Sequence, residues 1–311
     1  MRRAIVTGGR GFIGRHLVAD LRRRAVQVTT IGSGPSQDRQ HFTLGRGVWN
    51  AAQIAGILEA DQPDAIFHLA GTAVGRPAEL DRVNIGLAMS LMQALGRTGQ
   101  HPLLVVAGSA SEYGAAIASG VPVCESAMCR PVSPYGRSKL AQTRAALSYG
   151  DATGTPVLVA RIFNPVGPGI PAHLALGSFA AQIASIAGQR GTLRTGNIDV
   201  KRDFIDVEHV ASMLCNLALN PAARGIVNLC SGKAISLRAL VKRLIAISGK
   251  SVAIEQDPER VRPDDLPLIV GSTALLRRHG ERPPPTDYSD VLARVWAAAQ
   301  SPAVRKEGCI A

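Results

Sequence analysis

A turn rich in glycine lies near the start of the chain, in the stretch AIVTGGRGFIG at residues 4–14. Residues 4–6 have the length and β-branching of a buried strand, and apolar residues at helical spacing begin at Phe12. Glycines at 8, 11 and 14 permit a tight turn, close approach of a pyrophosphate to the backbone, and close packing of helix on strand. The unpaired N–H groups at the start of the new helix favour an anion. This stretch predicts a dinucleotide-binding site.

The charge balance indicates anionic partners. The 311 residues include 35 Lys and Arg against 23 Asp and Glu, a formal net charge of +12, and only six of the basic residues are Lys. Aromatic residues make up only 4% of the chain, and no basic stripe is interleaved with them, which argues against a stacking platform for bases. We therefore expect phosphorylated small molecules as partners and no nucleic acid.

Cysteine use and hydropathy bear on metal binding and location. The five cysteines form no CxxC pair, so we expect buried or incidental thiols in a reducing compartment and no metal site. No apolar run approaches the ~20 residues that a membrane-spanning helix needs. The glycines also follow Met1 too closely for the apolar core of a signal peptide. A cytoplasmic protein without a membrane partner is expected.

Strand and helix patterns alternate along the chain. Buried-strand patterns occur at 27–31, 65–71, 103–109, 157–161 and 225–229, with helical patterns between them. This alternation predicts an α/β fold with a doubly wound parallel sheet, the Rossmann fold. Residues 164–171 are rich in Pro and Gly and mark a crossing into a second unit. We expect a dinucleotide-binding domain at 1–164, to which 204–230 returns, and mainly a smaller C-terminal substrate-binding domain at 165–311.

Three further motifs join the glycine loop to make a family resemblance. Tyr135 and Lys139 form a YxxxK motif in a helical pattern, Ser109 ends a predicted strand, and residues 202–207 read RDFIDV. The whole chain resembles the extended short-chain dehydrogenase/reductases that act on nucleotide sugars, the NAD-dependent epimerase/dehydratase family. The resemblance implies an oxidoreductase with Ser109, Tyr135 and Lys139 as catalytic residues. It also implies a homodimer whose contact includes the helix at 135–148.

The chemistry explains why these residue types are needed. A helix places Tyr135 and Lys139 one turn apart on one face. Hydride addition to a ketone produces an alkoxide, so an acid must stand beside the carbonyl oxygen. A phenol with a pKa near ~10 is a poor acid or base at neutral pH until a cation lowers that pKa, and Lys139 would supply the charge. Ser109 would donate a hydrogen bond to the same oxygen as charge develops.

The cofactor residues favour NADP(H), with NAD(H) as the other possibility. An acidic residue that binds the ribose 2′-hydroxyl of NAD is expected about 20 residues after the glycine loop, and Ser33 stands there instead. Arg10, with Arg39 as a second candidate, can accept a 2′-phosphate. Where the family commonly has an Asp beside the adenine, residues 47–50 read GVWN. The predicted cofactor-binding residues are Gly8, Arg10, Gly11, Phe12, Ile13, Gly14, Ser33, Arg39, Val48, Leu69, Ala70, Gly71, Asn84, Tyr135, Lys139 and Phe163.

The residues after Ser109 argue against a dehydratase. In sugar-nucleotide 4,6-dehydratases the two positions after the Ser or Thr usually include the acid or base that expels water, and here they are Ala110 and Ser111. Glu112 comes one position later, where strand alternation would turn its side chain away from the reacting carbon. A reductase or an epimerase remains.

Substrate-side segments favour a reductase. Residues 196–204, 230–236 and 262–265 resemble the corresponding segments of reductases that act on GDP-4-keto-6-deoxy-D-mannose. The resemblance implies that Arg202 and Arg262 bind the diphosphate, because guanidinium groups suit phosphates, and that Asn164 contacts the sugar or its first phosphate. The predicted substrate-binding residues are Ser111, Glu112, Asn164, Arg202, Arg262 and Asp265.

Three functions follow from these motifs. The first is NADPH-dependent reduction of the C4 ketone of a nucleotide-diphosphate 4-keto-6-deoxyhexose, with a GDP-linked sugar preferred. The second is a nucleotide-sugar 4-epimerase, which uses the same three side chains and holds NAD tightly between half-reactions. The third is a non-catalytic dinucleotide-binding regulator, against which the complete set of Ser109, Tyr135 and Lys139 speaks.

Overall fold

The fold is built on a seven-stranded parallel sheet. The computed structural model describes residues 1–45, 47–117, 120–261 and 266–301. The strand order is β10-β6-β5-β4-β1-β2-β3, and every neighbouring pair is parallel. The strands are β1 (Arg3–Thr7), β2 (Gln27–Gly32), β3 (His41–Thr43), β4 (Ala65–His68), β5 (Leu103–Ser109), β6 (Val157–Ile162) and β10 (Gly225–Leu229). The predicted α/β fold with a doubly wound parallel sheet is confirmed.

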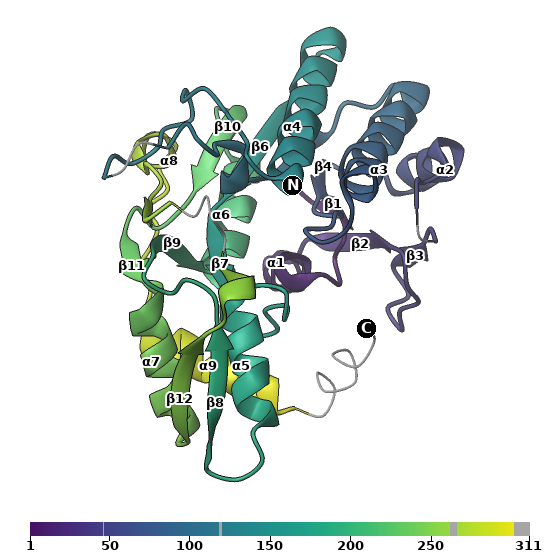
Figure 1. The fold of residues 1–311 in the computed structure, drawn as a ribbon. Helices are drawn as coiled ribbons and strands as arrows, with labels where there is room; N and C mark the ends of the chain where they lie inside the picture. The colour runs from purple at the N-terminus through teal and green to yellow at the C-terminus, as the bar shows by residue number, and fades with distance from the viewer. Residues whose placement is uncertain (46, 118–119, 262–265, 302–311) are drawn as a thin grey trace.

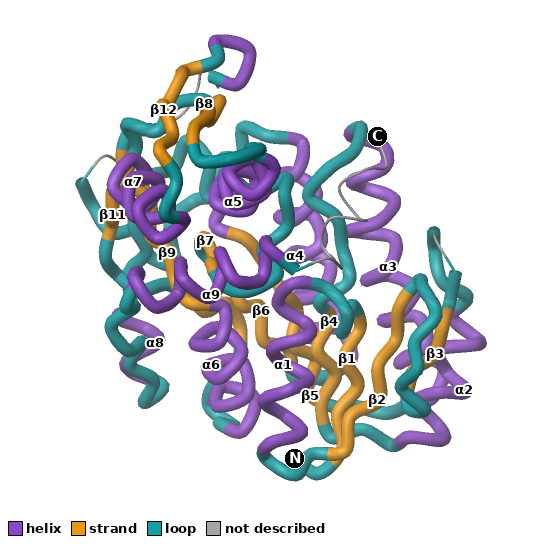
Figure 2. Tube along the Cα trace, turned by 90° about the horizontal axis from the view of Figure 1, so that it is seen from below, coloured by secondary structure: helices purple, strands orange, loops and turns teal. Residues whose placement is uncertain are grey.

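Helices cover both faces of this sheet, as Figures 1 and 2 show. One face carries α1 (Phe12–Arg23) and α6 (Val207–Leu219), which pack against each other. The other face carries α2 (Ala51–Asp61), α3 (Pro77–Thr98) and α4 (Pro134–Thr153). Because a buried parallel strand is apolar on both faces, its alternate residues enter two different cores. In β1, for example, Val6 joins the α1 and α6 core and Ile5 joins the other.

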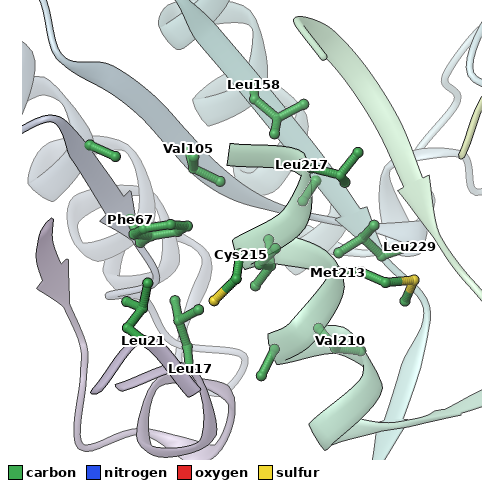
Figure 3. Packing of buried hydrophobic residues seen from close by; sticks show 14 of the residues in the cluster. Leu17, Leu21, Phe67, Val105, Leu158, Val210, Met213, Cys215, Leu217 and Leu229 are labelled. Carbon is green, nitrogen blue, oxygen red and sulfur yellow. The ribbon is translucent and has the colours of Figure 1, made fainter. Parts of the chain in front are cut away.

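Figure 3 shows the core between the sheet and the pair α1 and α6. Leu17 and Leu21 of α1 meet Phe67 of β4 and Cys215 of α6, and all four side chains are fully buried. This packing fixes α1, and with it the turn that leads into α1, against the carboxyl end of β1.

A second, smaller group of strands and helices lies beyond the carboxyl ends of the large sheet. Strands β7 (Asn164–Val166), β9 (Lys201–Asp206), β11 (Ala234–Ser236) and β13 (Leu268–Ile269) form a sheet centred on β9, and β8 (Arg190–Thr195) pairs with β12 (Ser251–Gln256). Helices α5 (Ala175–Ser185), α7 (Leu237–Ser248) and α9 (Tyr288–Gln300) supply its core. The remaining elements are η1 (Ala110–Glu112), η2 (Pro258–Arg260) and α8 (Ala274–Arg278). The domain boundary at residue 164 stays a prediction.

Local sequence signals explain where several helices begin and end. The side chains of Asn50, Ser133 and Asp206 accept hydrogen bonds from backbone N–H groups in the first turns of α2, α4 and α6. Gly99 and Gly154 end α3 and α4 in the left-handed conformation that glycine adopts without strain. Across the described ranges, no helix is both long and apolar enough to cross a membrane.

Two leucines of α6 provide a matched test of the core. Leu217 is fully buried in the α1 and α6 core, and Leu219 is 52% exposed on the same helix. We expect Leu217→Ala to lower the free energy of unfolding by about 2–5 kcal/mol, because it leaves a cavity. Leu219→Ala should change it by about 0.5 kcal/mol or less. Urea denaturation followed by circular dichroism measures both, and equal effects would contradict this packing.

Candidate active site

A cleft of about 960 Å³ lies where the large sheet meets the smaller group of elements. The carboxyl ends of β1, β4, β5 and β6 form one wall, at the point where the strand order reverses between β1 and β4. This crevice is where open parallel sheets bind ligands. Segments 170–179, 196–204 and 259–261 form the opposite wall.

The glycine turn after β1 lies at the bottom of this cleft. Gly8 has φ +71°, and a Cβ there would lie 2.7 Å from the backbone nitrogen of Ala70. A Cβ on Gly14 would lie 2.1 Å from the carbonyl oxygen of Gly8, so only glycine lets α1 pack this closely on the turn. Gly11 caps α1 without a side-chain hydrogen bond to the first turn. Helix N–H groups therefore stay available to an anion.

Thr7, just before this turn, is hydrogen-bonded to the end of β4 and to the residues that follow it. Its hydroxyl bonds to Nδ1 of His68 at 2.9 Å and accepts from the backbone N–H of Ala70 at 3.2 Å. Leu69 and Gly71 line the cleft on either side of Ala70. The ends of β1 and β4 thus form one rigid floor.

Ser109, Tyr135 and Lys139 meet at the wall of the cleft. Ser109 ends β5, and the other two lie one turn apart near the start of α4. Ser133 caps that helix by accepting from the N–H of Gly136 at 3.0 Å, and Pro134 follows it at the first helical position. Because Ser133 and Pro134 set the residue at which α4 begins, they also set the direction in which Tyr135 and Lys139 project from it.

The electrostatics of these side chains differ in one respect from the sequence-based expectation. Burial raises the pKa of Tyr135, and a hydrogen bond with Ser109 opposes that rise. The ammonium of Lys139 donates to Oε1 of Gln142. Burial lowers the pKa of Lys139 to about 8, against the opposing charge of Glu112. In this arrangement the pKa of Tyr135 is raised, whereas the sequence led us to expect a lowering.

Asn84 links three segments beside the cleft. Its Oδ1 accepts from the N–H of Thr72 at 2.9 Å, and its Nδ2 donates to Ser138 Oγ at 2.9 Å. The side chain is fully buried, so α3, α4 and the loop after β4 are held together at the predicted cofactor site. Phe12, Ile13 and Phe163 also line the cleft.

Arg10 lies in a second, smaller cavity outside the glycine turn. This cavity has a volume of about 370 Å³ and is bordered by Arg10, Arg15 and Arg22. Arg10 Nη1 donates to the carbonyl oxygen of Pro35 at 2.5 Å, and Arg22 pairs with Asp38, whose pKa it lowers. Arg15 and Arg22 were not predicted, although their spacing of seven residues places them on one helix face. The exposed side chains predicted with Arg10 border neither cavity: Ser33, Arg39 and Val48.

The substrate-side predictions fall partly on the far wall. Ser111, Asn164 and Arg202 line the cleft. Asn164 Nδ2 donates to the carbonyl oxygen of Asp203 at 2.8 Å, and the largely buried Arg202 donates to the carbonyl oxygen of Lys201 at 2.9 Å. Arg262 and Asp265 lie outside the described residues.

Asp203 holds this wall in place. Its buried carboxylate accepts from Ser231 N–H and Oγ–H at 2.8 and 2.6 Å, from Gly232 N–H at 3.0 Å, and from Gly271 N–H at 3.1 Å. Burial raises the pKa of Asp203, and these four donors oppose that rise. Arg202, the neighbour of Asp203 in β9, therefore lies on a strand that is hydrogen-bonded to residues 231–232 and 271.

Arg260 and Glu259 also line the cleft and were missed by the sequence analysis. A Cβ on Gly196 would lie 2.2 Å from the carbonyl oxygen of Arg260, so the glycine lets the η2 turn approach. No motif marks such a long-range approach, which explains the omission.

Glu112 is a correction to the predicted substrate residues. Its side chain is fully buried and does not line the cleft. One carboxylate oxygen accepts from the N–H of Ser109 and the other from Arg161, both at 2.8 Å. The short helix η1 turns the side chain back under β5, so it has no free face toward a substrate.

The comparisons with known proteins agree with this geometry. The model of the NAD dependent epimerase/dehydratase family matches residues 4–230. The chain is 34% identical over 282 residues to GDP-6-deoxy-D-mannose reductase of Pseudomonas aeruginosa, covering 88% of this chain and 90% of that protein. A solved structure of RMD from P. aeruginosa with NADPH has a TM-score of 0.81 and 30% identity, covering 96% of this chain and 99% of that chain. UDP-glucose 4-epimerase of Thermus thermophilus with NAD has a TM-score of 0.83 and 26% identity, covering 96% of this chain and 99% of that chain.

The chain therefore belongs to the NAD-dependent epimerase/dehydratase family, and the resemblance to the extended short-chain dehydrogenase/reductases is confirmed. It is an enzyme of the NAD(P)-dependent class that includes nucleotide-sugar reductases, dehydrogenases and epimerases. The glycine turn, with its close backbone approaches and uncapped helix start, fits the nicotinamide dinucleotide that this family uses.

Two glycines in helices provide a matched test of the turn. We expect Gly14→Ala to lower the free energy of unfolding by about 1–3 kcal/mol and to weaken cofactor binding, because the new Cβ would overlap the Gly8 carbonyl oxygen. Gly96→Ala in α3 meets nothing within 4 Å and should raise stability by about 0.5–1 kcal/mol. Thermal denaturation and NADPH fluorescence titration measure the two effects. Unchanged cofactor binding in Gly14→Ala would contradict the assignment of the turn.

Proposed function

We propose that the protein reduces the C4 ketone of a nucleotide-diphosphate 4-keto-6-deoxyhexose, with NADPH as the reductant. The preferred substrate is GDP-4-keto-6-deoxy-D-mannose, and the product is GDP-D-rhamnose or its C4 epimer. The observation that carries the proposal is the meeting of Ser109, Tyr135 and Lys139 between the glycine turn and the Asn164 and Arg202 wall. The 34% identity to GDP-6-deoxy-D-mannose reductase supports the choice of sugar.

The roles of the three side chains follow from their chemistry. A reduced dinucleotide held by its phosphates at the glycine turn would supply hydride to the ketone carbon. Tyr135 donates a proton to the ketone oxygen, and Ser109 donates a hydrogen bond to the same oxygen. Lys139, with a pKa of about 8, remains mostly protonated at neutral pH and stabilises the negative charge that passes through this cluster.

The far wall binds the substrate by its phosphates and sugar. Arg202 contacts the diphosphate, and Asn164 contacts the sugar or the first phosphate. Arg262 and Asp265, outside the described residues, are proposed to complete this set. Because dehydration needs an acid or base next to Ser109, and Glu112 is bound to Arg161, elimination of water is disfavoured.

One assay tests this function directly. Purified protein is mixed with NADPH and freshly made GDP-4-keto-6-deoxy-D-mannose, and with UDP- and dTDP-linked 4-keto sugars in parallel. We expect oxidation of NADPH with the GDP-linked sugar, and a loss of at least about 100-fold in kcat for Tyr135→Phe, which lacks the acid. The absence of turnover with every 4-keto sugar would rule out the reductase. A Tyr135→Phe variant with all properties of the parent would favour a non-catalytic regulator.

The cavity around Arg10 supports a preference for NADP(H). Arg10, Arg15 and Arg22 border it beside the glycine turn, and Ser33 stands where an acidic residue was expected. The carboxylate of Asp38 also borders the cavity and is paired with Arg22. We expect Arg10→Ala to weaken NADPH binding by roughly 10- to 100-fold, the value of a lost charged hydrogen bond, and to leave NADH binding almost unchanged. Isothermal titration with both cofactors measures this. Arg278→Ala on the distant helix α8 serves as the control for lost positive charge. A parent protein that binds NAD ten times better than NADP would refute the preference.

A 4-epimerase remains the second candidate, favoured by the similarity to UDP-glucose 4-epimerase of T. thermophilus. NAD retained through purification, with conversion of a UDP-sugar and no net consumption of NADPH, would select it. A homodimer that includes α4, a cytoplasmic location and a substrate-binding domain at 165–311 are parts of the same proposal.

A further inference from the structure

A buried ion pair lies directly behind the catalytic wall of the cleft. Arg161 Nε of β6 is 2.8 Å from Glu112 Oε2 of η1, and the two side chains are 3% and 0% exposed. The second oxygen of the carboxylate accepts from the backbone N–H of Ser109 at 2.8 Å. One carboxylate therefore connects β6 to the residue that ends β5.

The surroundings hold this pair in a single arrangement. The Arg161 guanidinium lies 4.6 Å above the ring of Tyr113, and Tyr113 donates to Asn228 at 2.6 Å. A Cβ on Gly108 would lie 2.8 Å from Glu112 Oε1, so only glycine leaves room for the carboxylate. Every side chain in this set is buried.

Stability alone does not account for such a pair. Burying two charges costs desolvation energy that their attraction often fails to recover, and apolar replacements are frequently as stable. The charge of Glu112 does act on the site. It favours the ammonium form of Lys139, whose pKa burial has lowered to about 8, and it raises the pKa of Tyr135.

The other groups that the structure describes around Lys139 do not supply this charge. Gln142 accepts from its ammonium as a neutral amide. His68 is neutral, since burial lowers its pKa to about 3. Among the described residues, Lys139 and Tyr135 interact with His68 from β4, Ser109 from β5, Glu112 from η1 and Gln142 from α4, and Arg161 from β6 lies behind Glu112.

We propose that Glu112 is a positioning residue of this site: its carboxylate, held by Arg161, accepts from the backbone N–H of Ser109 and places a negative charge behind the cluster of Ser109, Tyr135 and Lys139. The inference rests on the proposed function for the catalytic roles of Ser109, Tyr135 and Lys139. The contact of Glu112 with Ser109 and its effect on Lys139 do not depend on that function, and the titration of Lys139 is measured without substrate.

The test is Glu112→Gln, which keeps the size of the side chain and removes its charge. With lysine labelled by ¹³C at Cε, a pH titration by NMR follows Lys139, assigned by its loss in Lys139→Met. We expect the pKa of Lys139 to fall by roughly half a unit to one unit, the direction for a lost nearby anion. The alkaline limb of the kcat profile should move to lower pH by the same amount. Glu208→Gln, which breaks an exposed ion pair with Arg294, should move neither.

A second variant covers the case in which Glu112→Gln does not fold. Glu112→Leu with Arg161→Met removes both charges and fills the space. It should lower the Lys139 pKa by less than Glu112→Gln does, because the lost cation offsets part of the lost anion. A folded variant with an unchanged Lys139 pKa, or with a lower kcat and an unmoved pH profile, would overturn the proposal and leave a structural role. Failure of the parent to reduce any 4-keto sugar would defeat only the proposed function, since the Lys139 titration still decides this inference.

Discussion

The close contact between the glycine turn and its neighbours is the constraint on which the rest of the site depends. Gly8 lies against the backbone of Ala70, and Gly14 lies against the carbonyl oxygen of Gly8, at separations that exclude any side chain. The packing of α1 on α6 presses the helix into this position (Figure 3). The floor of the cleft, the direction of the α1 N-terminus and the edge shared by β1 and β4 all follow from these contacts.

Burial and the charge of Glu112 both act on the wall of the cleft that carries Tyr135 and Lys139. Burial disfavours the ammonium of Lys139 and the phenolate of Tyr135, while the carboxylate of Glu112 favours the first and disfavours the second. Both effects keep the phenol of Tyr135 protonated and make it a weaker acid, whereas only the carboxylate favours the charged form of Lys139. The ion pair of Glu112 and Arg161 does not line the cleft, but it is linked to the cleft through the backbone of Ser109.

The opposite wall depends on long-range hydrogen bonds. Asp203 gathers the backbone of segments 231–232 and 271 around β9, and this strand carries Arg202 toward the cleft. Residues that are far apart in the chain therefore define one surface. The large sheet supplies one side of the cleft, and the smaller elements in Figure 1 supply the opposite wall.

The sequence alone determined the parallel sheet and the glycine turn, which rest on apolar periodicity and on glycine at fixed spacing. Helical spacing placed Tyr135 and Lys139 one turn apart, and the family resemblance added Ser109 to them. Only the tertiary structure decided the burial of Glu112 against Arg161, the lining by Arg260 and the cavity around Arg10. These depend on the approach of segments separated by tens of residues, for which the chain carries no local pattern. The raised pKa of Tyr135 belongs to the same group, because burial and charge are set by packing, whereas residue type is set by the sequence.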